Sequence, residues 1–333
     1  MRPFSPEKSR SSSGAADRRA ELMLGASAVG VLALIALMTV TVFINAWPSF
    51  SHNSFYKWFL PGGDVDVQLR SIITESTPGH PIYHLRAWPL LWATMLTTGL
   101  AVLIGISFSI LAAVFIVEFA PGGLRQILDP VVRLLAGVPS VVYGLIGILA
   151  IAPWVEHNFI SEQRKESVAG VVQLTGANLG VAVLILTVMI TPIMVAIIVN
   201  ALSAVPRAWT EGSTALGVNR WRTTWRISLR TARPAIIAAA VLATARALGE
   251  AIMLALVSGG RGFAPNLLDG TTALFEPARP LAATIIHYYE DLSNPAMAAT
   301  LYAMAAVLLV SSALLSLAGW GAKQPLKRYG IRT

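Results

Sequence analysis

The stretch LGVAVLILTVMITPIMVAIIVNAL, residues 179–202, carries no charged side chain, and its polar side chains are Thr187, Thr191 and Asn200. A helix needs about 20 predominantly apolar residues to cross roughly 30 Å of hydrocarbon, at about 1.5 Å of rise per residue. The stretch therefore predicts a transmembrane helix.

Five similar runs lie on either side of it, at residues 22–47, 89–120, 131–155, 235–257 and 296–320. The chain of 333 residues is 55% hydrophobic and only 13% charged, whereas soluble domains carry about 25% charged residues. A β-barrel is excluded because its strands are about ten residues long and alternate in polarity, whereas these runs are apolar throughout. The sequence predicts an all-α integral membrane protein with six transmembrane helices.

Arg18 and Arg19 precede the first run, as basic residues precede the apolar region of a signal peptide. That region is normally 7 to 15 residues long and is followed by an A-x-A-type cleavage site. This run is longer and lacks such a site, so we interpret it as a retained first span. Residues 1–21 have too little apolar surface to fold alone and predict a disordered cytoplasmic tail, and 321–333 form the other tail.

Lysine and arginine are distributed unevenly between the two sides of a six-span topology. Short cytoplasmic segments retain positive charge, and the side that carries the N-terminus holds most of these residues. The opposite side holds Lys57, Arg70, Arg86, Arg164, Lys165, Arg261 and Arg279, and Arg246 lies within a span. We therefore expect both termini in the cytoplasm. The net charge of +8 is explained by segments that face anionic lipid, so no nucleic acid partner is predicted.

Residues 48–88 form the longest segment between predicted spans, on the external side. The segment is rich in aromatic residues, which indicates either a short helix lying on the membrane surface or a plain loop. His80 and His84 are separated by Pro81 and lack nearby carboxylates, so we interpret them as loop residues and predict no metal site.

The third run contains Pro139 near its middle, where we expect a kink. Proline is tolerated in membrane helices where hydroxyls, water or neighbouring helices satisfy the freed carbonyl groups. Ser140 and Tyr143 are therefore candidates to line a packed or hydrated interior. The alternative is a kink that serves packing alone.

The segment 203–234, between the fourth and fifth runs, has the pattern of two short helices. Pro206 suits a first helical turn, Gly217 suits a left-handed position after a helix, and Asn219 can cap the next helix. In that next helix, Trp221, Trp225 and Leu229 form an apolar stripe. Beside it, four arginines form a basic stripe: Arg222, Arg226, Arg230 and Arg233. Such a face docks either on a partner protein or on anionic lipid.

This segment resembles the EAA loop of ABC-importer permeases, E-x5-G-x9-I-x-L. The matching residues are Glu211, Ala215, Leu216, Gly217, Ile227 and Leu229. The resemblance implies a coupling helix that inserts into an ATPase subunit. Gly212 and Ser213 depart from the family's pair of alanines, and Arg230 stands where a proline usually follows. Pro234 comes four residues later, as a candidate end of the helix.

Arg246 and Glu250 lie within the fifth run, where a charge costs about 2.5–3.5 kcal/mol on insertion scales. At i and i+4 of one helix they would share a face and could pair. Either the pair only pins helices together, or Arg246 supplies positive potential to an anion path while Glu250 holds or gates it. An arginine fork forms two parallel hydrogen bonds to a phosphate-like oxyanion.

ARALGEA at 245–251 and LAGVPSVVYG at 135–144 resemble two signatures of phosphate-importer permeases. The resemblance extends over all six runs, and the long segment before the second run favours the PstC type over its PstA-type partner. It implies the type I ABC importer fold, with 89–320 as the permease core, in a bacterial cytoplasmic membrane. The implied substrate path is Pro139, Ser140, Tyr143, Arg246 and Glu250.

The same resemblance implies four partners: a PstA-like second permease, PstB-like ATPases, a PstS-like external phosphate-binding protein, and membrane lipid. No G-x-x-x-x-G-K-[ST] phosphate-binding loop occurs in the chain. We therefore expect no cofactor and no catalytic residue of its own, with ATP bound by a partner chain. Permeases for another anion or small nutrient remain a close alternative, and an anion channel or membrane sensor is an alternative of another class.

Overall fold

The computed structural model describes residues 10–324 except 78, 169 and 171. Apart from one isolated bridge between Thr77 and His80, these residues form helices and loops without strands. Six helical stretches are long and apolar enough to span a membrane: Asp17–Asn53, Trp88–Phe119, Ser140–Phe159, Leu179–Ser203, Arg220–Leu248 and Pro295–Ala322. The predicted all-α fold with six membrane helices is confirmed.

Helix α9 (Leu179–Ser203) is the centre of the main core. Helix α4 (Trp88–Val114) packs closely against it, because a Cβ at Gly105 would lie 2.8 Å from the Met194 side chain. Ser109 donates a hydrogen bond across this interface to the Thr191 carbonyl oxygen (3.3 Å), and the Thr187 hydroxyl, which donates to Val183 of its own helix (2.7 Å), lies 3.4 Å from the Ala101 carbonyl oxygen. A glycine and two hydroxyls thus allow close helix packing within an apolar environment.

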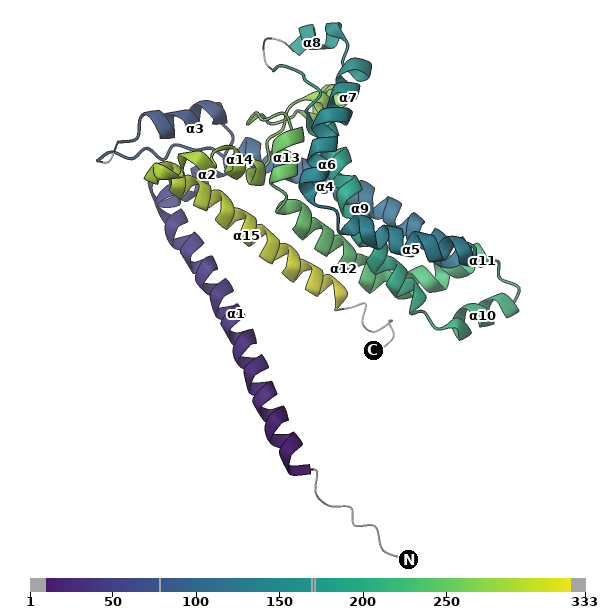
Figure 1. Ribbon diagram of the computed structural model, residues 1–333. Coiled ribbons are helices and arrows are strands. Elements are labelled where there is room, and N and C mark those ends of the chain that lie inside the picture. Colours follow the sequence, from purple (N-terminus) through teal and green to yellow (C-terminus); the bar gives the residue numbers. More distant parts are fainter. Residues whose placement is uncertain (1–9, 78, 169, 171, 325–333) are drawn as a thin grey trace, which may run out of the picture.

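A second core lies where α1 (Arg10–Asn53) and α15 (Pro295–Lys323) meet (Figure 1). Residues of α2 (Phe55–Trp58), α3 (Val65–Thr74) and α14 (Leu281–His287) also belong to this core. The start of α1, the end of α15 and the segment 203–234 lie toward the opposite end of the molecule in Figure 1. We call these two ends the α3 end and the loop end.

Predicted boundaries at both termini and in the external loop need correction. Residues 321–323, predicted to belong to the C-terminal tail, are part of α15. Residues 10–21, predicted to be a disordered tail, belong to α1; alanine, arginine and glutamate are good helix formers, so the helix continues past the apolar run. Residues 1–9 and 325–333 lie outside the described residues. In the predicted 48–88 loop, α1 continues through Pro48 to Asn53, and α2 and α3 follow.

The third span begins at Ser140, so the predicted run 131–155 with an internal kink is wrong at its start. Helix α5 (Gly122–Ala136) ends before Gly137, and α6 (Ser140–Ile146) begins after Pro139, followed by η2 (Gly147–Ile151) and α7 (Ala152–Phe159). Proline disfavours helical geometry in the residue before it, so the chain breaks here instead of bending. Helix α5 is attached to α9 by Arg125–Ser203 (2.9 Å) and Arg133–Asn200 (3.1 Å) hydrogen bonds.

The fifth span also differs from the predicted 235–257. Helices α11 (Arg220–Thr223) and α12 (Leu229–Leu248) are joined through the π-helical η3 (Thr224–Ser228). Pro234 lies inside α12 and does not end it, because the apolar run beyond it sustains the helix in a packed environment. The chain then unwinds at residues 249–251, and α13 (Ile252–Val257) follows as a separate helix.

The remaining elements are η1, α8, α10, η4 and η5. The π-helical η1 (Phe115–Phe119) ends the second span, α8 (Glu162–Val168) follows the third, and α10 (Arg207–Ala215) follows the fourth. The 3-10 segments η4 (Leu267–Phe275) and η5 (Tyr289–Ser293) flank α14. Helices α10 and α11 form a helical hairpin at the loop end.

Candidate functional site

The loop-end hairpin has the local geometry that its sequence predicts. Helix α10 begins after Pro206 and ends at Ala215, and Gly217 adopts the left-handed φ of 77°. The Asn219 side chain accepts a hydrogen bond of 2.8 Å from the Arg222 amide and so caps the next helix. A hydrogen bond of 2.9 Å between the Ser213 and Thr223 hydroxyls ties α10 to α11.

The residues predicted to couple to an ATPase divide into two groups. Ala215, Leu216 and Gly217 are exposed at the tip of the hairpin, where Leu216 is 85% exposed, and Glu211 is exposed in the middle of α10. Ile227 is half-buried and Leu229 is buried against the core. An apolar side chain this exposed on a tight turn is available to a partner surface, whereas the second group anchors the hairpin to the bundle.

The apolar stripe of the hairpin is likewise split. Trp221 and Trp225 stay about half exposed and lie edge to face at 5.6 Å, while Leu229 is buried. Trp221 also lies 6.1 Å from Phe119, at the end of the second span. The stripe therefore reaches from the surface into the bundle and does not form one continuous exposed face.

Arg246 and Glu250 do not pair, so the predicted i, i+4 pair is wrong. The helix ends at Leu248, and residues 249–251 are not helical, so the two residues are not four apart on one helix. Glu250 is 9% exposed, and its carboxylate accepts a hydrogen bond of 3.4 Å from the Met253 amide in the first turn of α13. Arg246 is exposed in the single chain, and among the described residues it has no ion-pair partner.

Pro139 precedes α6 and is exposed, Ser140 begins the helix and is half-buried, and Tyr143 is buried. The Tyr143 hydroxyl donates a hydrogen bond of 3.1 Å to the Leu135 carbonyl, across the break before α6.

The signature segment 135–144 ends against α13, the helix that directly follows the signature segment 245–251. A Cβ at Gly144 would lie 3.1 Å from the Met253 backbone, so α6 and α13 are in direct contact. Segments about a hundred residues apart in the sequence, α6 and α13, therefore meet in one region. This region is the candidate substrate path.

An ion pair around the buried Arg279 lies at the α3 end and was not predicted from the sequence. Arg279 is 2% exposed and pairs with Asp66 in the first turn of α3. Arg279 also donates to the Gly260 carbonyl (2.8 Å), and Asp66 accepts from the Gly262 amide (3.1 Å). Asp66 and Arg279 belong to segments that are far apart in the sequence. No local spacing pattern links them, so the sequence carries no signal that identifies the pair.

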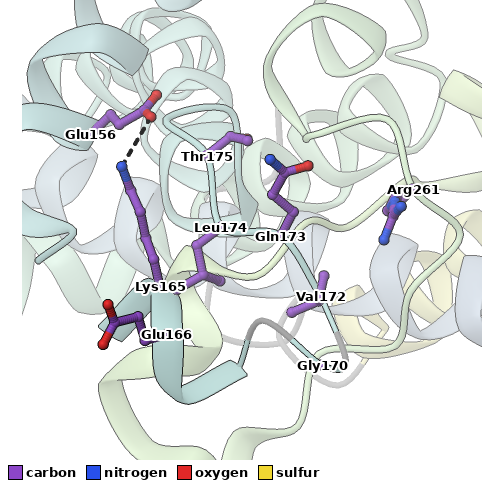
Figure 2. A pocket seen from close by; sticks show the side chains of 9 residues that line it. All are labelled: Glu156, Lys165, Glu166, Gly170, Val172, Gln173, Leu174, Thr175 and Arg261. Carbon is purple, nitrogen blue, oxygen red and sulfur yellow. Dashed lines mark ion pairs between the residues drawn. The ribbon is translucent and has the colours of Figure 1, made fainter. Parts of the chain in front are cut away.

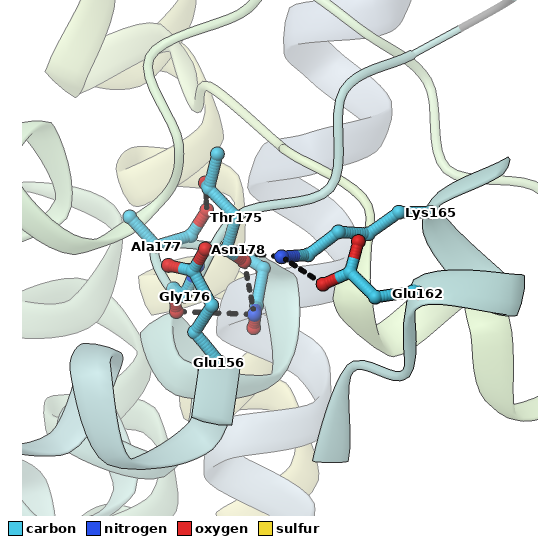
Figure 3. Close-up of polar contacts among 7 residues, drawn as sticks. All are labelled: Glu156, Glu162, Lys165, Thr175, Gly176, Ala177 and Asn178. Carbon is cyan, nitrogen blue, oxygen red and sulfur yellow. Dashed lines mark hydrogen bonds and ion pairs between the residues drawn. The ribbon is translucent and has the colours of Figure 1, made fainter. Parts of the chain in front are cut away.

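A polar pocket of about 600 Å³ also opens at the α3 end, beside α8 (Figure 2). Lys165 and Arg261 lie on different sides of it, and Glu156 reaches Lys165 at 3.6 Å. Figure 3 shows Lys165 between Glu156 and Glu162, the latter at 3.1 Å, and a hydrogen bond to Glu162 raises the pKa of the Lys165 ammonium group.

The loop beside this pocket is held by its own polar groups. The Asn178 amide donates to the Thr175 and Gly176 carbonyls (3.0 and 3.1 Å), and Glu156 accepts from the Gly176 amide (3.1 Å), as Figure 3 shows. These contacts give the surface a defined shape, with charges of both signs. No group of three or more potential metal ligands occurs among the described residues.

Residues 105–319 match the family described as "Binding-protein-dependent transport system inner membrane component". This chain belongs to that family. It is therefore a multi-pass inner-membrane permease subunit, and the candidate path and the loop-end hairpin both fall within the matched region.

Two curated relatives resemble this chain over most of its length. A probable ABC transporter permease, YqgH of Bacillus subtilis, is 31% identical over 86% of this chain and 85% of the relative. A probable phosphate transport system permease protein PstC of Methanocaldococcus jannaschii is 30% identical over 87% of this chain and 88% of its own. The resemblance to PstC-type permeases is confirmed.

The fold of this binding-protein-dependent permease also occurs in a solved structure. It matches a chain of the bacterial alginate ABC transporter, crystallised with its alginate-bound periplasmic protein, with a TM-score of 0.58 and 15% identity. The match covers 95% of this chain and 99% of that one. At that identity the likeness shows the fold, which is that of ABC importer permeases.

Proposed function

We propose that this permease forms the translocation path of an ATP-driven importer of inorganic phosphate. The observation that carries the proposal is Arg246, a guanidinium within a membrane span that has no ion-pair partner among the described residues. An unpaired charge at that depth is costly unless a ligand or a water-filled path accompanies it. Phosphate oxyanions supply matching acceptors for an arginine fork.

The neighbours of Arg246 fit a path for an anion. Tyr143 is held by its hydrogen bond to Leu135, and Ser140 begins α6 just after the Pro139 break. Glu250 is occupied at the start of α13 and does not neutralise Arg246. In this proposal Arg246 attracts the anion, Ser140 and Tyr143 line the route, and Glu250 maintains the break in the fifth span.

The permease assembles in this proposal with a PstA-like second permease, PstB-like ATPases and a PstS-like binding protein. The loop end faces the cytoplasm, because most lysines and arginines of the chain lie on that side. The exposed Leu216 turn contacts an ATPase, and ATP is bound there and not by this chain. The polar pocket at the α3 end, with Lys165 and Arg261, offers charged groups to the external binding protein.

The test is ATP-dependent uptake of labelled phosphate by vesicles that contain the reconstituted complex. Arg246→Gln is expected to reduce uptake at least tenfold while the complex still assembles, and Arg246→Lys to reduce it less, because the charge remains but the fork is lost. Arg19→Gln is the matched control, since this exposed arginine on α1 lies outside the path.

Three results would contradict the proposal. Normal uptake by Arg246→Gln would make the arginine structural. Equal competition by sulfate would point to a permease for anions in general. Phosphate flux without ATP would favour a channel.

A further inference from the structure

A second polar cavity, of about 390 Å³, lies at the loop end between the α10 hairpin and the bundle. Helix α10 lines it with Arg207 and Glu211, and the bundle lines it with Glu118 of η1 and Arg125 of α5. Four charged side chains of both signs thus border one cavity, outside the candidate substrate path.

The charges are arranged in complementary order. Arg207 and Glu211 are four residues apart on α10 and therefore share one face of that helix. On α10 the basic residue comes first in the sequence and the acidic residue second. On the bundle wall the acidic residue, Glu118, comes first and the basic residue, Arg125, second. Each charge of α10 therefore shares the cavity with an opposite charge on the wall, with Glu118 available to Arg207 and Arg125 available to Glu211.

None of the four forms an ion pair with another described residue. Glu118 accepts a hydrogen bond of 3.1 Å from the Ser228 hydroxyl, and Arg125 donates one of 2.9 Å to the Ser203 hydroxyl. Both bonds hold the side chain in place and leave its charge uncompensated. By contrast, Arg133 and Asp129 of α5 do pair, at 3.4 Å.

The two sides of the cavity are connected in different ways. The wall is fixed to the core, since α5 is hydrogen-bonded to α9 through Arg125 and Arg133. Helix α10 is joined to α9 by the short turn 204–206, and to α11 by the turn at Gly217 and the Ser213–Thr223 hydrogen bond. Among the described residues no hydrogen bond or ion pair joins α10 to the wall formed by η1 and α5, whereas η1 is joined to η3 by Glu118 and Ser228. Single-turn π-helical insertions are frequent at functional sites.

We propose that Glu118 and Arg125 are positioning residues for energy coupling: they form ion pairs with Arg207 and Glu211 when α10 moves into the cavity. The inference rests on the proposed function, in which ATPases act on this hairpin. Closing the cavity removes water from between the charges and strengthens their attraction. The pairs then transmit displacement of α10 to the second span and, through α5, to α9.

Charge reversal tests the pairs in the reconstituted complex. Arg125→Glu and Glu211→Arg are each expected to lower ATP-dependent uptake about fivefold or more, on the scale of a surface ion pair replaced by like charges. The double variant, which restores opposite charges, is expected to return uptake to within about twofold of wild type. Gln126→Glu, at an exposed position next to Arg125, is the matched control and should leave uptake nearly unchanged.

Cysteine cross-linking reports the movement without measuring transport, and the chain contains no native cysteine. Val117→Cys on η1 and Thr210→Cys on α10 both line the cavity. Disulfide formation between them is expected to accelerate severalfold in ATP plus vanadate. Equal rates with and without nucleotide, or single reversals that the double variant fails to rescue, would overturn the proposal. A wild-type complex without ATP-driven phosphate uptake, yet with nucleotide-dependent cross-linking, would instead refute only the phosphate assignment.

Discussion

Arg279 and Asp66 form a buried ion pair that joins the loop after the broken fifth span to α3. The Arg279 side chain is 2% exposed and that of Asp66 24%. The guanidinium also lies over the Tyr288 ring at 5.3 Å, while its Nε atom is buried without a hydrogen-bond partner among the described residues. This connection fixes the α3 end of the fold, because α13, α14 and α3 converge on it.

Removing one member of this pair should destabilise the protein strongly. We expect Asp66→Asn to lower the free energy of unfolding by about 3 kcal/mol, because the buried Arg279 charge would lose its counter-ion. Thermal unfolding of the purified permease in nanodiscs measures the change. Asp129→Asn, which breaks the exposed pair with Arg133, is the control and should cost less than about 1 kcal/mol. Equal losses of unfolding free energy in the two variants would contradict the conclusion that the Arg279–Asp66 pair is the more stabilising of the two.

Glu276 should make stability depend on pH. Its carboxyl is buried outside the spans, and burial raises its pKa above the ordinary value of 4.5 although it accepts a hydrogen bond from the Asn266 amide. The folded state therefore holds this proton more tightly than the unfolded chain does. The contribution to stability is full below the ordinary value and is lost as the pH rises through the raised one.

We expect Glu276→Gln to remove this dependence. Unfolding midpoints of wild type and variant are compared across a pH series from below 4.5 to neutrality. Wild type should lose stability relative to the variant as the pH rises. A constant difference between the two proteins across the series would show that Glu276 does not titrate in this range.

We expect the effect of replacing Gly217 to come from its left-handed backbone conformation and not from contacts of the new side chain. Its φ is 77°, and a Cβ at this position would meet nothing within 4 Å. Left-handed geometry costs most residues roughly 1–2 kcal/mol, whereas asparagine adopts it more readily. Gly217→Ala is therefore expected to impair ATP-driven uptake and Gly217→Asn to retain most of it. If both variants failed equally, the small size of glycine at the proposed ATPase contact would be the cause.

Local features of the sequence predicted much of this protein. Length and polarity sufficed for the six helices, because a helix that crosses hydrocarbon satisfies its own backbone hydrogen bonds and must be apolar throughout. The left-handed Gly217 and the Asn219 cap were also predictable, since each depends on neighbours within a few residues. The signature segments at 135–144 and 245–251 identified the family later shown by the match over residues 105–319.

Tertiary packing decided what lies between distant residues. Arg246 and Glu250 looked like an i, i+4 pair, yet the helix unwinds at 249–251, where α13 packs on α6 at Gly144. The Asp66–Arg279 pair and the four charges around the α10 cavity likewise join separate segments. The sequence by itself determined the helices and their caps, because these depend on short-range hydrogen bonds and hydrophobicity; only the packed structure decided which charges meet, because this depends on how the helices are positioned against one another.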